Sequence, residues 1–101
     1  MTRTSFGADD LTGVDGYKLG TGLIVPRPIG WIGSINAEGA TNLAPYSFFN
    51  MVAGAPPTFV FAPGLSARRD TLGNVRAVPE FTINIVTRSV VDAMNSTAAS
   101  L

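Results

Sequence analysis

The chain has 101 residues, enough for one small domain, and it contains neither cysteine nor histidine. These two absences exclude disulfides, thiolate nucleophiles, triads that use histidine and metals held by histidine, so any chemistry must come from a bound cofactor or from carboxylates and hydroxyls. Seven basic and seven acidic residues cancel to a formal net charge of zero, which argues against the basic footprint that a nucleic-acid partner requires.

The first quarter of the chain is rich in glycine and poor in periodic apolar pattern. Residues 1–16 are expected to form a polar N-terminal arm, followed by a single domain at 17–101. The three glycines between 16 and 22 predict a short helical turn at most. The apolar residues 23–25 precede a pair of prolines that cannot donate to a sheet, which predicts an edge or a strand entrance.

Four strands and two short helices are predicted in the rest of the chain. The clearest strand alternates Phe81, Ile83 and Ile85 with polar neighbours. Leu72 and Val75, with a residue one turn later, are expected to form the buried face of the first helix. The predicted elements are strands at 29–35, 41–51, 58–62 and 80–87, a helix at 70–78 that begins with Asp70 as its N-cap, and a helix at 90–94 capped by Ser89.

This order of elements predicts a mainly β fold with short helices. Antiparallel strands joined by turns suit a barrel-like sheet with helices packed outside it. Four strands close a barrel poorly, so the barrel is expected to be incomplete at the C-terminal end.

The segment 66–71 places two arginines and two hydroxyl-bearing residues at the predicted start of a helix. Free backbone N–H groups and the positive end of the helix dipole favour an anion at such a position. The guanidinium of arginine also matches phosphate oxygens. The alternative is a solvated loop in which Asp70 caps the helix.

The stretch 42–50 alternates polar donors with small and aromatic residues around a proline. A planar heteroaromatic ligand needs an apolar wall and hydrogen-bonding groups at its ring edge, and this stretch offers both; a core strand is the alternative. Arg27 and Ser34 offer a cation and a hydroxyl upstream, although Arg27 can equally be a surface charge. The carboxylates show no paired spacing for acid–base work, so no catalytic side chain and no metal site are predicted.

Taken together, these segments resemble the successive blocks of the flavin reductase-like family, which includes flavoredoxins and related FMN-binding split-barrel proteins. The resemblance runs from about Tyr17 to the last predicted helix. Members of that family continue with further strands, so the chain is similar to their N-terminal half. The blocks that carry the resemblance are residues 25–29, 42–49, Pro56 with Pro57, Arg69 to Thr71 with Asn74, and residues 80–84.

The resemblance implies a six-stranded split barrel, a homodimer and one FMN per subunit at or near the dimer interface. Residues 42–49 would line the isoalloxazine, Arg69 and Thr71 would hold the phosphate, and Arg27 and Ser34 would lie near the ribityl–phosphate end. The residues expected to bind the cofactor are Arg27, Ser34, Asn42, Ala44, Ser47, Phe48, Phe49, Arg69, Asp70 and Thr71.

The function implied by the resemblance is that of an NAD(P)H-dependent flavin reductase, in which a hydride passes between the nicotinamide and the flavin. The alternatives are an electron-transfer FMN-binding protein without flavin reductase activity, and an inactive fragment or assembly subunit. Charged residues make up 14% of the chain, against roughly 25% in an average domain, which also favours a covering partner. No signal peptide and no apolar run of membrane-spanning length is visible, so a cytoplasmic protein without membrane contact is expected.

Overall fold

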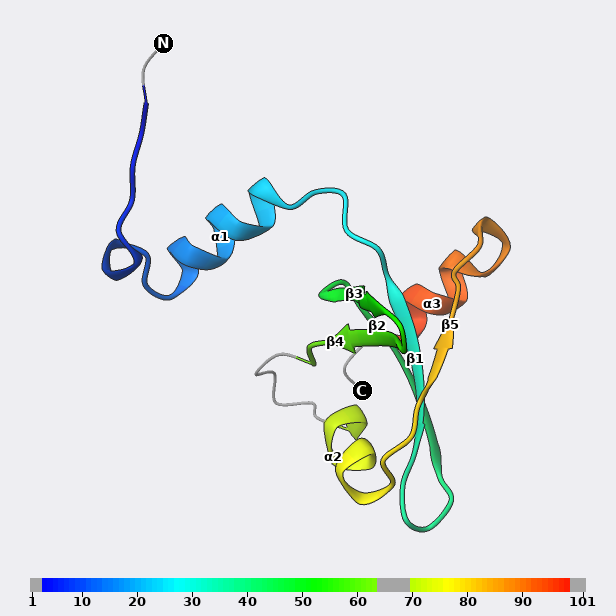
Figure 1. The fold of residues 1–101 in the computed structure, drawn as a ribbon. Coiled ribbons are helices and arrows are strands. Elements are labelled where there is room, and N and C mark those ends of the chain that lie inside the picture. Colours follow the sequence, from blue (N-terminus) through cyan, green and yellow to red (C-terminus); the bar gives the residue numbers. More distant parts are fainter. Residues whose placement is uncertain (1–2, 64–69, 99–101) are drawn as a thin grey trace.

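The computed structural model describes residues 3–63 and 70–98, and it consists of two small sheets with helices around them (Figure 1). The strands are β1 (Gly30–Ile35), β2 (Thr41–Tyr46), β3 (Phe49–Gly54), β4 (Pro57–Phe61) and β5 (Thr82–Asn84). The α-helices are α1 (Val14–Leu23), α2 (Asp70–Ala77) and α3 (Val91–Thr97), and two 3-10 turns, Ala8–Asp10 and Arg88–Val90, precede α1 and α3. The predicted fold class, mainly β with short helices, is confirmed.

The first sheet is antiparallel and has the order β2–β1–β5, so β1 is its central strand. In the β1–β2 ladder Gly30 lies opposite Tyr46, and Ser34 lies opposite Asn42. The second sheet is the hairpin β3–β4, which follows β2 after a link of two residues. Neither sheet closes into a barrel within the part of the chain that the structure describes.

Burial along β1 alternates, and it separates the two faces of the first sheet. Gly30, Ile32 and Ser34 are buried on the face that contacts α2. Trp31 belongs to the opposite face, where its indole N–H donates a 3.0 Å hydrogen bond to the hydroxyl of Thr97 in α3. The sheet therefore lies between α2 and α3, as the alternation predicted for residues 29–35 allows.

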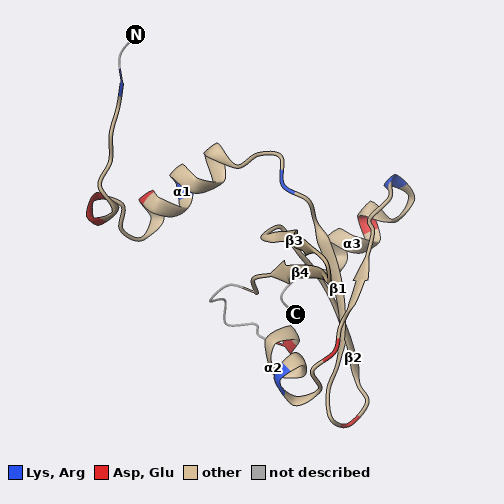
Figure 2. Cartoon of the chain, in the orientation of Figure 1, with Lys and Arg blue, Asp and Glu red and all other residues tan. Residues whose placement is uncertain are grey.

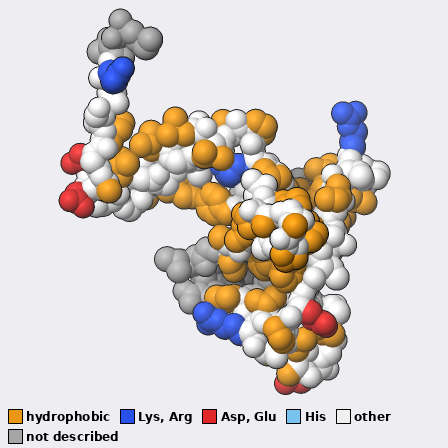
Figure 3. Space-filling model, in the orientation of Figure 1, with side chains coloured by type: hydrophobic (Ala, Val, Ile, Leu, Met, Phe, Trp, Pro, Cys, Tyr) orange, Lys and Arg blue, Asp and Glu red, His pale blue; other side chains and the backbone are white. Residues whose placement is uncertain are grey.

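The core of the described residues is very small. Ile32 is their one buried hydrophobic side chain. The radius of gyration is 16.3 Å, against about 13 Å for a compact domain of this length. Large apolar side chains instead gather on the surface over the hairpin and along α1 (Figure 3), among them Leu23, Ile24, Met51, Val52, Phe59 and Val60.

Charge does little to cover this surface. The five strands contain no Lys, Arg, Asp or Glu, and the charged residues lie in helices, turns and linkers (Figure 2). The shortage of charge noted in the composition is thus concentrated on the sheets. Apolar faces of this kind are typical of surfaces that another part of a protein or a partner covers.

The helix α1 is longer than the sequence analysis predicts. Ten residues are helical in place of a single turn, and the helix crosses the expected boundary between residues 16 and 17. Glycine costs about 1 kcal/mol relative to alanine in a helix, which is why its three glycines favoured a turn. The aromatic ring of Tyr17 packs edge-on against Phe48, with 6.2 Å between ring centroids. This tertiary contact helps to offset the poor local propensity.

Three strand predictions need correction. Residues 23–25 are not in a strand, because α1 occupies the first of them and a loop follows. The stretch 41–51 is two strands, since the chain leaves the first sheet after Tyr46 and enters the second at Phe49. The segment 80–87 pairs over only three residues, opposite the middle of β1. Alternation shows that a segment can be a strand, but a neighbour must be present for it to pair.

Both predicted helices at the C-terminal side exist, with differences in detail. In α2 the buried residue is Thr71, while Leu72 and Val75 are only half-buried. The helix docks through polar partners on the sheet, which the apolar pattern could not reveal. In α3 the N-cap is Val90 without a side-chain cap, and Ser89 lies in the preceding 3-10 turn.

Candidate functional site

Thr71 lies at the centre of a polar network that joins α2 to the first sheet. Its side chain is 1% exposed, and its hydroxyl oxygen accepts hydrogen bonds from the amide of Asn42 at 3.0 Å and the phenol of Tyr46 at 2.6 Å. One turn later, the amide of Asn74 donates to the hydroxyl of Ser34 at 3.0 Å. Because hydrogen bonds are directional, these contacts fix how α2 is rotated on the sheet.

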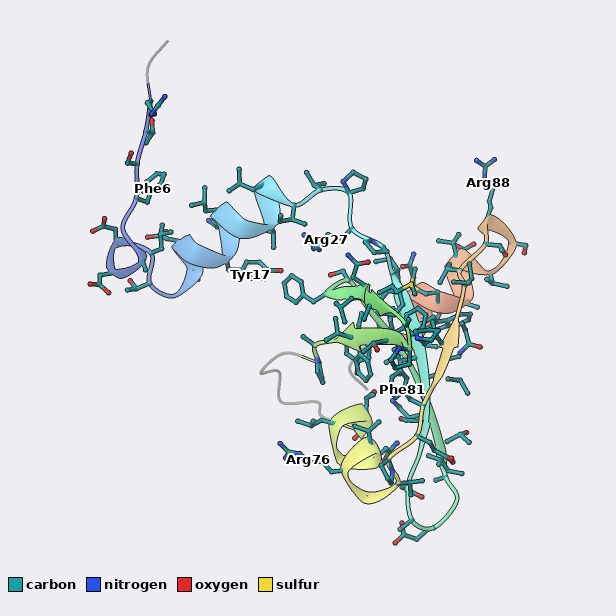
Figure 4. The ribbon with its side chains drawn as sticks, in the orientation of Figure 1. Phe6, Tyr17, Arg27, Arg76, Phe81 and Arg88 are labelled. Atoms are coloured by element: carbon teal, nitrogen blue, oxygen red, sulfur yellow. The ribbon has the colours of Figure 1, made fainter. Side chains whose placement is uncertain are left out.

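Arg27 makes a second cluster just beyond Tyr46, at the end of the β1–β2 ladder away from Ser34 and Asn42. Its guanidinium donates to the carbonyl of Ser47 at 3.2 Å, to the hydroxyl of Ser47 at 3.2 Å and to the carbonyl of Ile24 at 3.3 Å. The same group lies 5.1 Å from the ring centroid of Phe48, within cation–π range. In Figure 4 Arg27 lies in the linker between α1 and β1, beside the hairpin.

Phe49 and Ala44 have packing roles in this structure. The ring of Phe49 lies over Gly30, so closely that a Cβ atom on Gly30 would be 2.5 Å from a ring carbon. It also lies almost parallel to the ring of Phe59, with a centroid separation of 6.4 Å. Ala44 is half-buried in β2 opposite Ile32. These two residues therefore contribute to side-chain packing on the two sheets.

The described part of the chain contains a larger and a smaller groove near the predicted residues. The larger, about 880 Å³, takes most of its lining from the sheet face opposite α2 and from the end of α3. The smaller, about 320 Å³, lies between α1 and the cluster around Arg27 and Phe48. The larger groove touches Ser34 and Asn42 at its edge, but the side chains of both bond to α2 on the other face. It is therefore not the place where the predicted binding residues gather.

The structure sorts the predicted residues into two groups. Ser34, Asn42 and Thr71 lie together at the α2 end of the ladder. Arg27, Ser47 and Phe48 form the second group, in which Arg27 bonds to Ser47 and lies over the ring of Phe48. Asn42 and Ser47 are five positions apart, which corresponds to about 17 Å for an extended chain.

The predicted phosphate ligands, Arg69 and Thr71, flank Asp70 in the sequence. Arg69 lies outside the described residues, so its role stays a prediction. Asp70 is the first residue of α2 and is exposed. The hydroxyl oxygen of Thr71 accepts hydrogen bonds from its two partners in the sheet, and the backbone at the start of α2 offers further donors to a ligand.

Sequence reasoning gave no individual role to Tyr46, in the stretch 42–49, or to Asn74, in a block that carries the resemblance. Tyr46 follows Asn42 by four residues and so shares its face in a strand. That spacing was the signal for a common partner. The position of Asn74 did not indicate a partner in the sheet, since an amide in a helix can equally face solvent.

Comparison with known proteins places this arrangement in a family. The family model described as flavin reductase like domain matches residues 22–101. The nitrilotriacetate monooxygenase component B of Bacillus cereus is 41% identical, with a TM-score of 0.88 over 100% of this chain and 51% of that chain. The 2-nitrobenzoate 2-nitroreductase of Pseudomonas fluorescens is 36% identical, with a TM-score of 0.82 over 97% of this chain and 48% of that one.

A curated relative gives the same result. An uncharacterized protein of Aquifex aeolicus is 42% identical over 81 residues, which are 77% of this chain and 41% of the relative. The chain thus spans about half the length of the proteins it matches. No helix within residues 3–63 and 70–98 is both long and apolar enough to cross a membrane. On these similarities, the chain belongs to the flavin reductase-like domain family.

Proposed function

We propose that this chain is the FMN-binding part of an oxidoreductase of the flavin reductase type, which passes a hydride between NAD(P)H and the flavin. The observation that carries the proposal is the contact of Thr71 with Asn42 and Tyr46. It joins the segment expected to line the isoalloxazine to the segment expected to hold the phosphate. The similarity to a monooxygenase component and a nitroreductase supports redox chemistry.

The residues present suit an elongated ligand with a planar end and an anionic end. Asn42 and Ser47 are five positions apart, about 17 Å for an extended chain, a length comparable to that of extended FMN. At one end, the start of α2 offers backbone N–H groups and a positive helix dipole to a phosphate. At the other end, Phe48 is 42% exposed and so has ring surface available for a planar partner.

FMN would supply the hydride-accepting chemistry when bound. The side chains of this chain would bind and orient it. Phe48 would provide apolar contact to the isoalloxazine, and Ser47 would offer hydrogen-bonding groups at the ring edge. The start of α2 would anchor the phosphate, held in place by the buried hydroxyl of Thr71. No carboxylate or other side chain of the described clusters is assigned a proton-transfer role.

A homodimer is part of this proposal. The exposed apolar side chains of the hairpin and of the α1 region need a covering surface, and burial of apolar area is the main driving force of association. The family resemblance supplies a second copy of the chain as the partner. NAD(P)H would then reach the flavin from the side left open by both copies.

Anaerobic titration of the purified protein with FMN and then NADH or NADPH tests the proposal. We expect quenching of FMN fluorescence on binding and bleaching of the flavin absorbance when the nicotinamide is added. Binding without bleaching would favour an electron-transfer protein over a flavin reductase. Absence of binding to either FMN or riboflavin would overturn the flavin site altogether.

A further inference from the structure

The link between the two sheets consists of only two residues, Ser47 and Phe48. β2 ends at Tyr46 in the first sheet, and β3 begins at Phe49 in the second. The conformation of this link therefore sets where the hairpin lies relative to the first sheet. Ser47 is half-buried, whereas Phe48 is 42% exposed.

Arg27, which precedes β1, hydrogen-bonds to this link. Two of its donor groups, Nε and Nη2, bond to the carbonyl and the hydroxyl of Ser47, both at 3.2 Å. Its Nη1 bonds back to the carbonyl of Ile24, which ties the guanidinium to its own linker. The planar group also lies near the ring of Phe48, with 5.1 Å to the centroid. Arg27 thus contacts both residues of the link.

The local sequence explains why Arg27 can act in this way. Pro26 and Pro28 flank it, and proline fixes its own φ and has no N–H to give to a sheet. The linker therefore stays out of the ladder and is stiff, so the side chain starts from a defined position. Because β1 and β2 are antiparallel, the residues before β1 lie beside those after β2. Arginine then spans the remaining gap with a rigid fork of donors.

We propose that Arg27 is a positioning residue that sets the Ser47–Phe48 link, and through it the ring end of the flavin site, without contacting the phosphate. This inference rests on the proposed flavin-binding function. It differs from the role implied by the family resemblance, which put Arg27 near the ribityl–phosphate end. Its contacts lie at the opposite end of the ladder from the paired residues Ser34 and Asn42.

The two roles predict different ligand selectivities, because riboflavin contains the ring but lacks the phosphate. Arg27→Met removes the fork and the charge while keeping a similar apolar stem. We expect it to weaken FMN and riboflavin binding by the same factor, roughly tenfold from the loss of charge-assisted hydrogen bonds. Loss confined to FMN would show that Arg27 holds the phosphate and would overturn the proposal.

Arg27→Lys separates geometry from charge. Lysine keeps the positive charge but cannot make both bonds to Ser47 with a planar fork. We expect Arg27→Lys to bind both flavins more weakly than the wild type but more tightly than Arg27→Met. At saturation, its bound flavin should show the same shifted visible absorption band as in Arg27→Met. We call the contacts of Arg27 with Ser47 and Phe48 the clamp. Wild-type affinity and band position in Arg27→Lys would mean that the charge alone matters, and would refute the clamp.

Arg88→Met is the matched control. Arg88 is exposed at the 3-10 turn before α3, and Figure 4 shows it projecting away from the rest of the molecule. We expect this variant to bind both flavins like the wild type. An equal loss in Arg88→Met and Arg27→Met would attribute the effect to net charge.

Hydrogen–deuterium exchange of the flavin-free protein tests the clamp independently of any ligand. In Arg27→Met we expect faster exchange in peptides that cover the Ser47–Phe48 link and β3, with β1 and α2 unchanged. Unchanged exchange at the link would refute the clamp, even where flavins bind. Faster exchange at the link in Arg27→Met, together with no flavin binding by the wild type, would instead refute the proposed function and leave the clamp standing.

Discussion

The phenol of Tyr46 donates a 2.6 Å hydrogen bond to the hydroxyl of Thr71, a side chain that is only 1% exposed. This bond links a strand of the first sheet to the first turn of α2 across 25 positions of sequence. A buried acceptor shared by two donors is a small network, and the loss of the acceptor deprives both donors of this partner. The stability of this junction is therefore directly testable.

Tyr46→Phe removes one hydroxyl and little else. Thr71 keeps its bond from Asn42, so we expect the free energy of unfolding to fall by about 1 kcal/mol, the net value of one hydrogen bond. Urea unfolding measures the change. The matched control is Tyr17→Phe, since Tyr17 is the other tyrosine of the chain and is 60% exposed. Its effect should stay within about 0.5 kcal/mol; equal losses would deny the Tyr46–Thr71 bond any special role.

Thr71→Val has the more severe effect. Valine has nearly the same shape, but the amide of Asn42 and the phenol of Tyr46 would both lose their acceptor. We expect a loss of about 1–3 kcal/mol from buried groups left unsatisfied, and a smaller loss for Thr71→Ser, which keeps the hydroxyl. Combined with Tyr46→Phe, the valine variant should cost less than the sum of the single changes. Strict additivity in urea unfolding would contradict a shared network.

Gly30→Ala tests the close packing of Phe49 on β1. An ideal Cβ atom at this position would lie 2.5 Å from a ring carbon of Phe49, so the ring must move. We expect a loss of about 1–3 kcal/mol, as for other overpacked sites. At Gly20 in α1 no heavy atom outside the local helix backbone lies within 4 Å, and Gly20→Ala should be neutral or stabilise by up to about 1 kcal/mol. Thermal unfolding that ranks the two variants the other way would refute this packing.

Arg69→Ala tests the phosphate anchor predicted from the sequence. Loss of a charge-assisted contact should weaken FMN binding by about ten- to a hundredfold, whereas riboflavin binding should hardly change. Fluorescence quenching of each flavin provides the measurement. Arg76→Ala, in the last turn of α2 and exposed, serves as the control with an equal change of charge. Equal losses for both flavins would assign Arg69 to the fold and not to the phosphate.

Sedimentation equilibrium tests the predicted dimer. The exposed apolar side chains of the hairpin, such as Val52 at 60% and Val60 at 48%, should favour association at micromolar concentration because their burial is favourable. A well-folded monomer at that concentration would contradict the dimer and the proposal that FMN lies at its interface.

Local pattern in the sequence was sufficient for several features. The pattern of residues 29–35 predicted the strand β1, which the structure confirms, but it did not say which of the two faces is buried. The helix at 70–78 was predicted to within one residue of α2. The order of the sequence blocks indicated the family, which the comparisons confirm. These features depend on periodicities and spacings of neighbouring residues, which the sequence displays directly.

Tertiary structure alone decided which of these elements meet. Tyr46 finds its acceptor in Thr71, and Arg27 finds the Ser47–Phe48 link, over separations of 20 residues or more. The division of 41–51 between two sheets and the shortness of β5 likewise depend on which neighbour is present. Hydrogen bonds of this kind have no period along the chain, because each requires two particular groups at one distance and angle, and only the folded backbone brings them there.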